Sequence, residues 1–259
     1  RGLRERGLGI VFVSHFLDQV FYLTDRVTVL RNGRKIVTER TAELDRVKLI
    51  EHMLGRALEH EVAEQAARTA AARPPLLEFR GFGRRGLVEP FDLTVGQGEV
   101  VGLAGLLGSG RTESAEMMFG VRPAQSGEAS DAQSRLDLSS PRAAIAQGFG
   151  FVPEERKTDG IVAELSIREN IILGLQARRG WARRVPRAEQ NRIADDYIKR
   201  LDIRTSGREK PIGELSGGNQ QKAILARWLA MNPRFLILDE PTRGIDVGAH
   251  AEILRLIRE

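Results

Sequence analysis

The residue types best suited to chemistry gather in the segment 214–246. The first group is a glycine pair, Gly217 and Gly218, which follows Ser216 and precedes an apolar-periodic run over 223–231. Glycines let backbone N–H groups approach a ligand closely, and a helix that starts there directs its free N–H groups and dipole toward an anion. The pattern predicts a phosphate-binding turn. The alternative interpretation is a glycine turn that binds nothing.

The second group is a pair of carboxylates, Asp239 and Glu240, which directly follows the apolar run 235–238. A short, continuously apolar run is typical of a buried strand in a parallel sheet. Sheets of this class hold their ligands at the carboxyl ends of the strands, so one acid can position Mg²⁺ while the other polarises a water. The alternative is a solvated entrance to a loop, because short motifs also occur by chance.

Together and in this order, the two groups resemble the ATP-binding cassette (ABC) ATPases. LSGGNQQK matches their signature motif, LILDE their Walker B motif, and RGID, which ends at Asp246, their D-loop. The resemblance implies an α/β fold: a P-loop NTPase core with a parallel sheet, an antiparallel β-subdomain and a helical signature subdomain. It also implies ATP and Mg²⁺ as cofactors. The implied signature residues are Leu215, Ser216, Gly217, Gly218, Asn219 and Gln220.

A glycine-rich stretch lies upstream, between a predicted buried strand over 99–104 and a predicted helix over 113–119. The P-loop pattern needs glycines so that backbone N–H groups wrap the phosphates, a lysine for the β- and γ-phosphates and a hydroxyl for Mg²⁺. Arg111 stands in the place of the lysine. Its guanidinium is longer and forked rather than a compact point charge. An ordinary strand-turn-helix is the alternative interpretation.

The resemblance assigns roles in and around this stretch. Thr112 and Asp239 are the implied Mg²⁺ ligands, and Glu240 is an implied catalytic residue. Phosphoryl transfer depends on positioning and charge, so we expect a site with arginine in place of lysine to bind nucleotide and turn over slowly. Glu154 occupies the place of the family's Q-loop glutamine. The implied nucleotide-binding residues are Gly105, Leu107, Gly108, Ser109, Gly110, Arg111, Thr112 and Glu154.

The N-terminal part opens with an apolar, β-branched run over 9–14 that predicts a strand ending at His15. Two short predicted strands over 26–30 and 34–38 then flank an Asn-Gly pair, which is a strong hairpin signal. A single histidine after a strand is usually structural. The resemblance instead implies that His15 is the switch histidine, a catalytic residue that contacts the γ-phosphate.

The order of the motifs predicts the domain organisation. The family's switch histidine follows Walker B, whereas His15 precedes every other motif. We predict that residues 1–57 are the C-terminal piece of a preceding cassette, 58–75 a partly helical linker, and 76–259 a second cassette without its own switch histidine. By family analogy the switch strand lies between the P-loop and Walker B strands. We expect residues 9–14 to fill that gap, in the same chain or a swapped neighbour, because buried unpaired backbone groups are costly.

Composition bounds the alternatives. The net charge of +5 and pI of about 9.9 suit an anionic ligand, a membrane surface or nucleic acid. The chain has no cysteine, which excludes disulfides and thiolate metal sites. No apolar run approaches the ~20 residues that span a bilayer, and no signal peptide is visible. A basic stretch over 178–184 suggests either a contact with anionic lipid headgroups or a solvated loop.

Three strings, GLLGSGRTE, VPEERKTDGI and LDEPTRGIDVGA, look like the second cassette of tandem ATPases that drive bacterial monosaccharide importers of the ribose, xylose and galactose group. The implied partners are a second cassette, in the same polypeptide or a dimer, membrane permease subunits and, indirectly, a periplasmic sugar-binding protein. The implied place is the cytoplasmic face of the bacterial inner membrane, without nucleic acid. The alternatives are a nucleoside importer ATPase and an ABC protein acting on ribosomes or nucleic acid.

Overall fold

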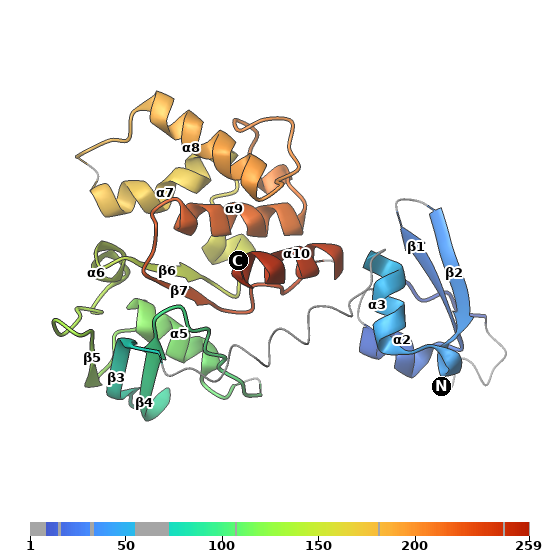
Figure 1. Cartoon of the computed structure of the whole chain (residues 1–259), viewed down its shortest axis with the longest axis horizontal. Helices are drawn as coiled ribbons and strands as arrows, with labels where there is room; N and C mark the ends of the chain where they lie inside the picture. The colour runs from blue at the N-terminus through green and yellow to red at the C-terminus, as the bar shows by residue number, and fades with distance from the viewer. Residues whose placement is uncertain are drawn as a thin grey trace. The chain divides into compact units, whose positions relative to one another are not determined.

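The computed structural model describes residues 9–14, 17–31, 34–54, 73–106, 108–180, 182–245 and 247–258. The chain divides into two compact units, Arg1–Ala71 with Ile245–Arg255 and Ala72–Gly244 with Leu256–Glu259. Figure 1 labels the elements of both units. None of the described helices is both long enough and apolar enough to cross a bilayer.

An antiparallel sheet in the order β4-β3-β5 belongs to the larger unit. Its strands are β3 (Pro75–Arg84), β4 (Val88–Gly96) and β5 (Ser126–Ser130). Phe79 on β3 pairs with Leu93 on β4 and with Ala129 on β5, and its side chain is buried. The antiparallel β-subdomain that the resemblance implied is present in this sheet.

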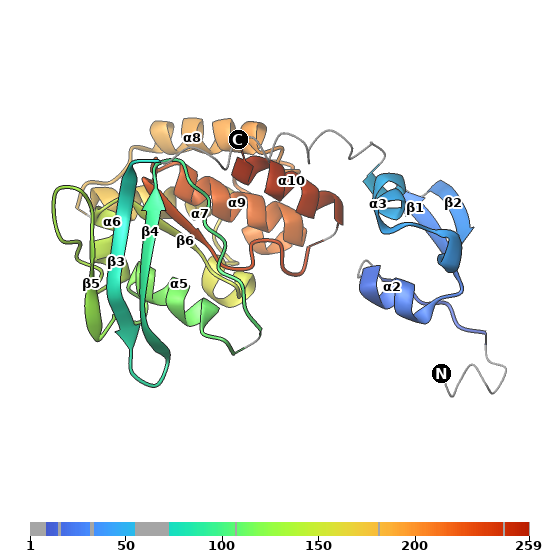
Figure 2. The ribbon, with the colours of Figure 1, turned by 60° about the horizontal axis from the view of Figure 1, so that its bottom comes forward.

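A parallel pair of strands forms the centre of the same unit. In this pair, β6 (Phe149–Val152) runs beside β7 (Phe235–Leu238). Helix α5 (Arg111–Phe119) covers one face of the pair and α9 (Gly217–Leu229) the other (Figures 1 and 2). A Cβ at Gly150 would lie 2.9 Å from Leu236 Cδ1 and 3.2 Å from Trp228 Cβ, so the close approach of α9 requires glycine there. The parallel strand predicted at 235–238 is confirmed.

Two predicted strands are absent from the sheet. Residues 99–104 form no strand, and Val100 and Leu103 are 77% and 45% exposed. Residues 9–14 also form no strand, and Val11 and Val13 are 93% and 91% exposed. The prediction of a buried strand at 99–104 is therefore wrong, and residues 9–14 form no strand within this chain, while their insertion into a swapped neighbour stays a prediction. The reason is that a strand needs a neighbour for its backbone hydrogen bonds, and β6 is the only ladder partner of β7 among the described residues. For the same reason β7 is mostly half-buried rather than fully buried as predicted.

Helices and turns complete the larger unit. Two long helices flank the basic stretch over 178–184. Ser166 caps the first long helix in a reciprocal pair with Glu169, which satisfies two backbone donors at once. The remaining elements are α6 (Pro141–Ala146), the π-helical turn η2 (Arg156–Gly160), α7 (Ile167–Arg179), α8 (Arg187–Arg200) and the 3₁₀ turn η3 (Ile212–Glu214).

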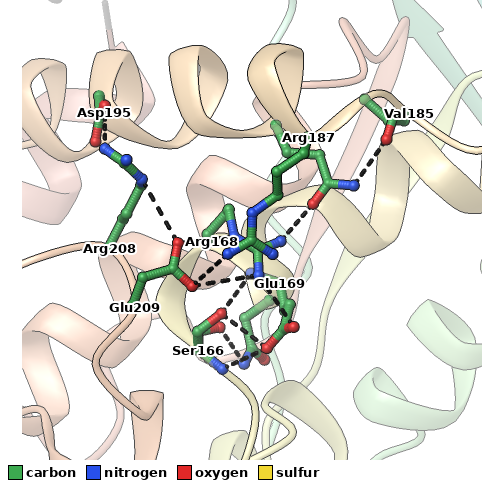
Figure 3. Close-up of polar contacts among 10 residues, drawn as sticks. Ser166, Arg168, Glu169, Val185, Arg187, Asp195, Arg208 and Glu209 are labelled. Atoms are coloured by element: carbon green, nitrogen blue, oxygen red, sulfur yellow. Dashed lines mark hydrogen bonds and ion pairs between the residues drawn. The ribbon is translucent and has the colours of Figure 1, made fainter.

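A buried arginine ties these helices together (Figure 3). Arg168 on α7 is 2% exposed, and it donates to Glu209 Oε1 at 3.1 Å and to Glu169 Oε1 at 3.0 Å. It also donates to Gln190 on α8. Arg168 holds the pKa of Glu209 below its ordinary value through a hydrogen bond and its charge, with a further contribution from Arg187. One guanidinium thus joins α7, α8 and the loop before η3.

The smaller unit contains a hairpin packed with short helices. Strands β1 (Arg26–Arg31) and β2 (Arg34–Arg40) pair antiparallel, as predicted, and the Asn-Gly pair between them lies outside the described residues. The buried hydrophobic cluster of this unit consists of Val29, Leu44 and Leu49. The other elements are α2 (Leu17–Leu23), the 3₁₀ turn η1 (Thr41–Glu43), α3 (Arg46–Leu54) and α10 (Val247–Arg258), of which α10 continues past the end of this unit.

The contacts of the buried Arg168 predict an order of stability among variants that remove a charge. Glu209→Gln should lower the free energy of unfolding by about 2 kcal/mol, because it leaves a buried guanidinium with less compensation. Arg168→Met should cost less, since it removes the buried charge itself. Urea denaturation monitored by circular dichroism measures both.

The matched control is Glu214→Gln. Glu214 pairs with Lys210 at 3.5 Å, and its side chain is 61% exposed, so its loss should change stability by less than about 0.5 kcal/mol. Equal losses for Glu209→Gln and Glu214→Gln would show that the buried charge at Arg168 does not depend on its partner.

Candidate functional site

A tight glycine turn leads into α5. Gly108 and Gly110 have φ angles of +78° and +91°, a region that side chains disfavour. A Cβ at Gly105 would lie 2.3 Å from Ser109 Oγ, so the turn folds back on itself too closely for any other residue. Gly110 is the N-cap of α5 and has no side chain to bind the first backbone N–H groups. These donors and the positive end of the helix dipole are therefore suited to an anion.

Arg111 begins α5 and reaches Glu240. Its Nη1 lies 3.1 Å from Glu240 Oε1, across the space between α5 and the end of β7. Glu240 has a φ of +44°, which is uncommon for a residue with a side chain and carries a backbone strain of order 1–3 kcal/mol. The cation in the place of the P-loop lysine is thus engaged with a carboxylate that was predicted to be catalytic.

Asp239 stands at the carboxyl end of β7 with an unsatisfied oxygen. Its backbone N–H donates to Val152 O at 2.9 Å, which extends the ladder with β6 by one bond. Its side chain is buried, and Oδ2 has no hydrogen-bond partner among the described residues. Burial raises the pKa of Asp239, and the charges of Glu154 and Glu240 raise it further, whereas Thr112 and Arg111 lower it. A buried carboxylate with an unpaired oxygen is a place where a cation is needed.

Thr112 and Glu154 complete this cluster. Thr112 Oγ1 donates to Glu154 Oε2 at 3.1 Å, so the hydroxyl of α5 meets the loop that follows β6. The structure therefore brings together Arg111, Thr112, Glu154, Asp239 and Glu240, which lie far apart in the sequence. No group of three or more histidine, aspartate, glutamate or cysteine side chains within the described ranges is arranged to hold a metal by itself.

Two arginines that the sequence reasoning missed hold the cluster from the other side. Arg243 forms ion pairs with Glu154 and, at 2.9 Å, with Glu155. Arg156 Nε donates to Gln220 Oε1 at 3.2 Å, and its Nη1 donates to the carbonyl of Arg243 at 3.2 Å. Burial lowers the pKa of Arg156. The strings VPEERK and RGID, which contain Arg156 and Arg243, were the sequence signals for these contacts, and neither string indicates the partners.

The predicted signature residues at the start of α9 have two different roles. Ser216 is exposed, and its Oγ accepts a hydrogen bond from Asn219 Nδ2 at 2.8 Å. Gln220 is buried, and its side-chain amide donates to the carbonyl oxygens of η3 and Leu215. Gly217 is half-buried at the same turn. Leu215 and Gln220 thus support the turn, while Ser216 and Gly217 remain accessible to a ligand.

Three predicted site residues lie outside the described residues: His15, Leu107 and Asp246. Their roles stay predictions.

Comparison with known proteins identifies relatives along the whole chain. A family model described as ABC transporter matches residues 88–243. The galactofuranose transporter ATP-binding protein of Escherichia coli (strain K12) is 56% identical over 257 residues, which is 99% of this chain and 51% of that protein. The fructose import ATP-binding protein of Bifidobacterium longum is 42% identical over 261 residues, with 99% and 51% covered. The chain thus spans about half the length of the curated relatives it matches.

Solved structures agree on the fold. A nucleotide-free ATP-binding cassette from an ABC transporter aligns with a TM-score of 0.60 and 19% identity, covering 71% of this chain and 76% of that chain. An ATP-binding cassette dimer in a post-hydrolysis state, bound to ADP and Pi, aligns with a TM-score of 0.59 and 23% identity, covering 70% and 81%. With the family model matching more than half of its residues, the chain belongs to the ABC transporter family and has the α/β fold of the ATP-binding cassettes.

Proposed function

We propose that the chain is part of the ATP-binding and ATP-hydrolysing subunit of a bacterial monosaccharide importer. The observation that carries this proposal is the start of α5 at Gly110, which no side chain caps, together with the contacts of Arg111 with Glu240 and of Thr112 with Glu154 beside Asp239. Relatives named for the import of galactofuranose, fructose and ribose support the sugar class. In this proposal residues 1–57 are the C-terminal piece of one cassette, 58–75 a linker and 76–259 a second cassette. The length of the relatives, about twice that of this chain, supports a tandem arrangement.

In this proposal the triphosphate of ATP lies over the glycine turn. The backbone N–H groups that follow Gly110 donate to phosphate oxygens, and Arg111 adds a positive charge. Glu240 holds the attacking water and accepts its proton. Arg111 must break its ion pair with Glu240 to reach a phosphate, because the same donor group cannot bond strongly to both. This exchange, together with the fork geometry of arginine, supports slow turnover at this site.

Thr112 and Asp239 fit a Mg²⁺ ion. The unpaired, buried Oδ2 of Asp239 is a hard oxygen ligand near the hydroxyl of Thr112, and Mg²⁺ prefers one or two protein oxygens together with phosphates and waters. When bound, the ion would neutralise phosphate charge. The protein's own part is to hold Asp239 at the end of β7 and to keep Glu154 and Glu240 close by.

The start of α9 serves a different nucleotide in this proposal. Ser216 and Gly217 face the ATP of a partner cassette, with the buried Gly218 behind them, and the partner's signature closes the site at Arg111. The exposed Ser216 and the dimeric cassettes among the similar structures support this arrangement. The other partners are membrane permease subunits and, through them, a periplasmic sugar-binding protein, at the cytoplasmic face of the inner membrane. The chain by itself, with half of each site, should hydrolyse ATP negligibly.

Arg111→Lys in the full-length subunit tests the slow-site proposal. Turnover of ATP should rise severalfold, because a compact ammonium can reach the phosphates without competing for Glu240 in a forked geometry. Addition of Glu240→Gln to this variant should remove the gain. Steady-state phosphate release measures both, with Arg234→Lys as a matched change at an arginine that pairs with Asp131 instead. Unchanged turnover in Arg111→Lys, combined with complete loss in Glu240→Gln alone, would rule out a slow site.

Asp239→Asn should separate stability from metal-dependent binding. Because the folded-state pKa of Asp239 is raised, the stability that its protonated form contributes is lost as pH rises through that pKa. The variant should therefore be more stable than wild type without nucleotide, by about 1 kcal/mol. It should also lose the Mg²⁺-dependent part of its affinity for a fluorescent ATP analogue.

Denaturant unfolding measures the stability of Asp239→Asn, and fluorescence titration with and without Mg²⁺ measures its affinity for the analogue. In the wild type, the Mg²⁺-dependent affinity should fall on acidification at a higher pH than an ordinary aspartate would give. An Asp239→Asn protein that is less stable, or that keeps its response to Mg²⁺, contradicts the assignment.

A further inference from the structure

A basic segment that the proposed function leaves without a role connects α7 to α8. Residues 178–187 contain five arginines and no acidic residue. They run from the last turn of α7 to the first residue of α8, on the side of the larger unit away from β3 and β4 (Figure 1). The contacts of these arginines decide whether the segment is an ordinary solvated connection or a site for an anionic partner.

Three of the five arginines are used by the fold. Arg178 donates to two backbone carbonyl oxygens just after the end of α9, where a cation suits the negative end of the helix dipole. Arg179 pairs with Glu189 through contacts of 2.6 and 3.1 Å, and Arg187 pairs with Glu209 at 2.9 Å. The hydrogen bond from Arg179 lowers the pKa of Glu189, so both members of this pair are charged at neutral pH. The acidic residues nearest the segment are therefore already paired.

The other two arginines, Arg183 and Arg184, have exposed side chains, and neither has a hydrogen-bond or ion-pair partner among the described residues. Their backbone is nevertheless held in place. The side-chain amide of Gln176 on α7 donates to the carbonyls of Gly180 at 2.8 Å and Arg183 at 3.3 Å, and it accepts from the backbone N–H of Val185 at 3.0 Å. The connection thus presents two uncompensated guanidinium groups from a fixed backbone.

Two adjacent cations of this kind gain nothing from the fold, because like charges repel and no carboxylate offsets them there. Phosphate groups would supply the missing acceptors, since a guanidinium binds a phosphate through two parallel hydrogen bonds. The remaining question is which phosphate-bearing partner this part of the surface meets.

A membrane fits better than a nucleic acid. The proposed function places the chain at the inner membrane, and its relatives include a transporter ATP-binding protein. Proteins that bind single-stranded nucleic acids combine cations with several aromatic stacking platforms. Only 5% of this chain is aromatic, and the segment contains a single aromatic residue, Trp181, which lies outside the described residues.

A lipid contact here is compatible with a partner cassette at the start of α9. Arg178 meets the carboxyl end of this helix, whereas Ser216 and Gly217 stand at its other end. The 13 residues of α9 span roughly 20 Å at 1.5 Å per residue. The two surfaces can therefore be occupied at the same time.

We propose that Arg183 and Arg184 bind the phosphate groups of anionic lipids in the membrane that carries the permease. The inference rests on the proposed function, which supplies the membrane. The contact is electrostatic and reversible, and it attaches the cassette to the lipid surface in addition to its contacts with the permease. No nucleotide is needed for it.

Sedimentation of the chain with lipid vesicles tests the proposal. The chain should bind vesicles of phosphatidylethanolamine and phosphatidylglycerol, and it should bind phosphatidylcholine vesicles far more weakly. Arg183→Gln combined with Arg184→Gln should lower the partition coefficient about 25-fold, because each basic residue near an anionic surface contributes about fivefold. Added salt should weaken the binding of the wild type, since it screens the attraction.

Two further pairs of variants separate a local site from a general attraction. Arg183→Lys with Arg184→Lys keeps both charges and should bind within about twofold of the wild type. Arg85→Gln with Arg142→Gln removes the same charge from exposed arginines in the β3–β4 turn and in α6, and it should also bind within about twofold. Thermal unfolding verifies that each variant is folded.

Four outcomes overturn the lipid site. They are equal losses in the two glutamine pairs, equal binding to both kinds of vesicle, displacement from vesicles by inorganic phosphate but not by chloride at the same ionic strength, and tighter binding of Arg183 and Arg184 to duplex DNA than to the anionic vesicles. A chain that binds an ATP analogue with Mg²⁺ but no vesicles counts against this inference alone. A chain that binds vesicles but no ATP analogue counts against the proposed function alone.

Discussion

The crowding of negative charge at the carboxyl ends of β6 and β7 governs the rest of the site. Glu154, Asp239 and Glu240 are close enough for the first and third to raise the pKa of the second. Like charges at such separations repel strongly unless cations lie between them. Arg111 compensates Glu240 and Arg243 compensates Glu154, whereas Oδ2 of Asp239 keeps no partner among the described residues. Arg111 and Arg243 thus offset two of the three carboxylates at this end of the strands.

Arginines also hold the surrounding helices in place. Arg168 and Arg227 are both buried, and each bonds to acceptors on at least two elements. A guanidinium suits this role because its donors spread in a rigid plane and it stays charged even when burial lowers its pKa. Arg227 donates to backbone carbonyl oxygens and to a side-chain amide oxygen rather than to carboxylates, and these three hydrogen bonds fix its position. Arg156 is only partly buried, and it bonds to Gln220 at the start of α9 and to the carbonyl of Arg243.

Much of the site could be predicted from local patterns. The glycines at 108 and 110 occupy positive φ, the apolar run at 235–238 forms a parallel strand, and α9 begins at the glycine pair. Each of these depends on residues within one turn or one strand. Arg156 and Arg243 could not be found this way, because their partners lie 64 and 89 residues away in the sequence. Nothing in a local pattern states which distant carboxylate or amide an arginine will meet.

The amino-acid sequence by itself determined the chemistry that is present: a glycine turn for phosphate, carboxylates after a strand, and an arginine where a lysine is usual. Only the tertiary structure decided which of these groups meet, as when Arg111 pairs with Glu240. It also decided that residues 99–104, apolar and β-branched as they are, form no strand. The physical reason is that a helix or a turn satisfies its backbone hydrogen bonds within one stretch of chain, whereas a strand depends on a neighbour supplied from elsewhere.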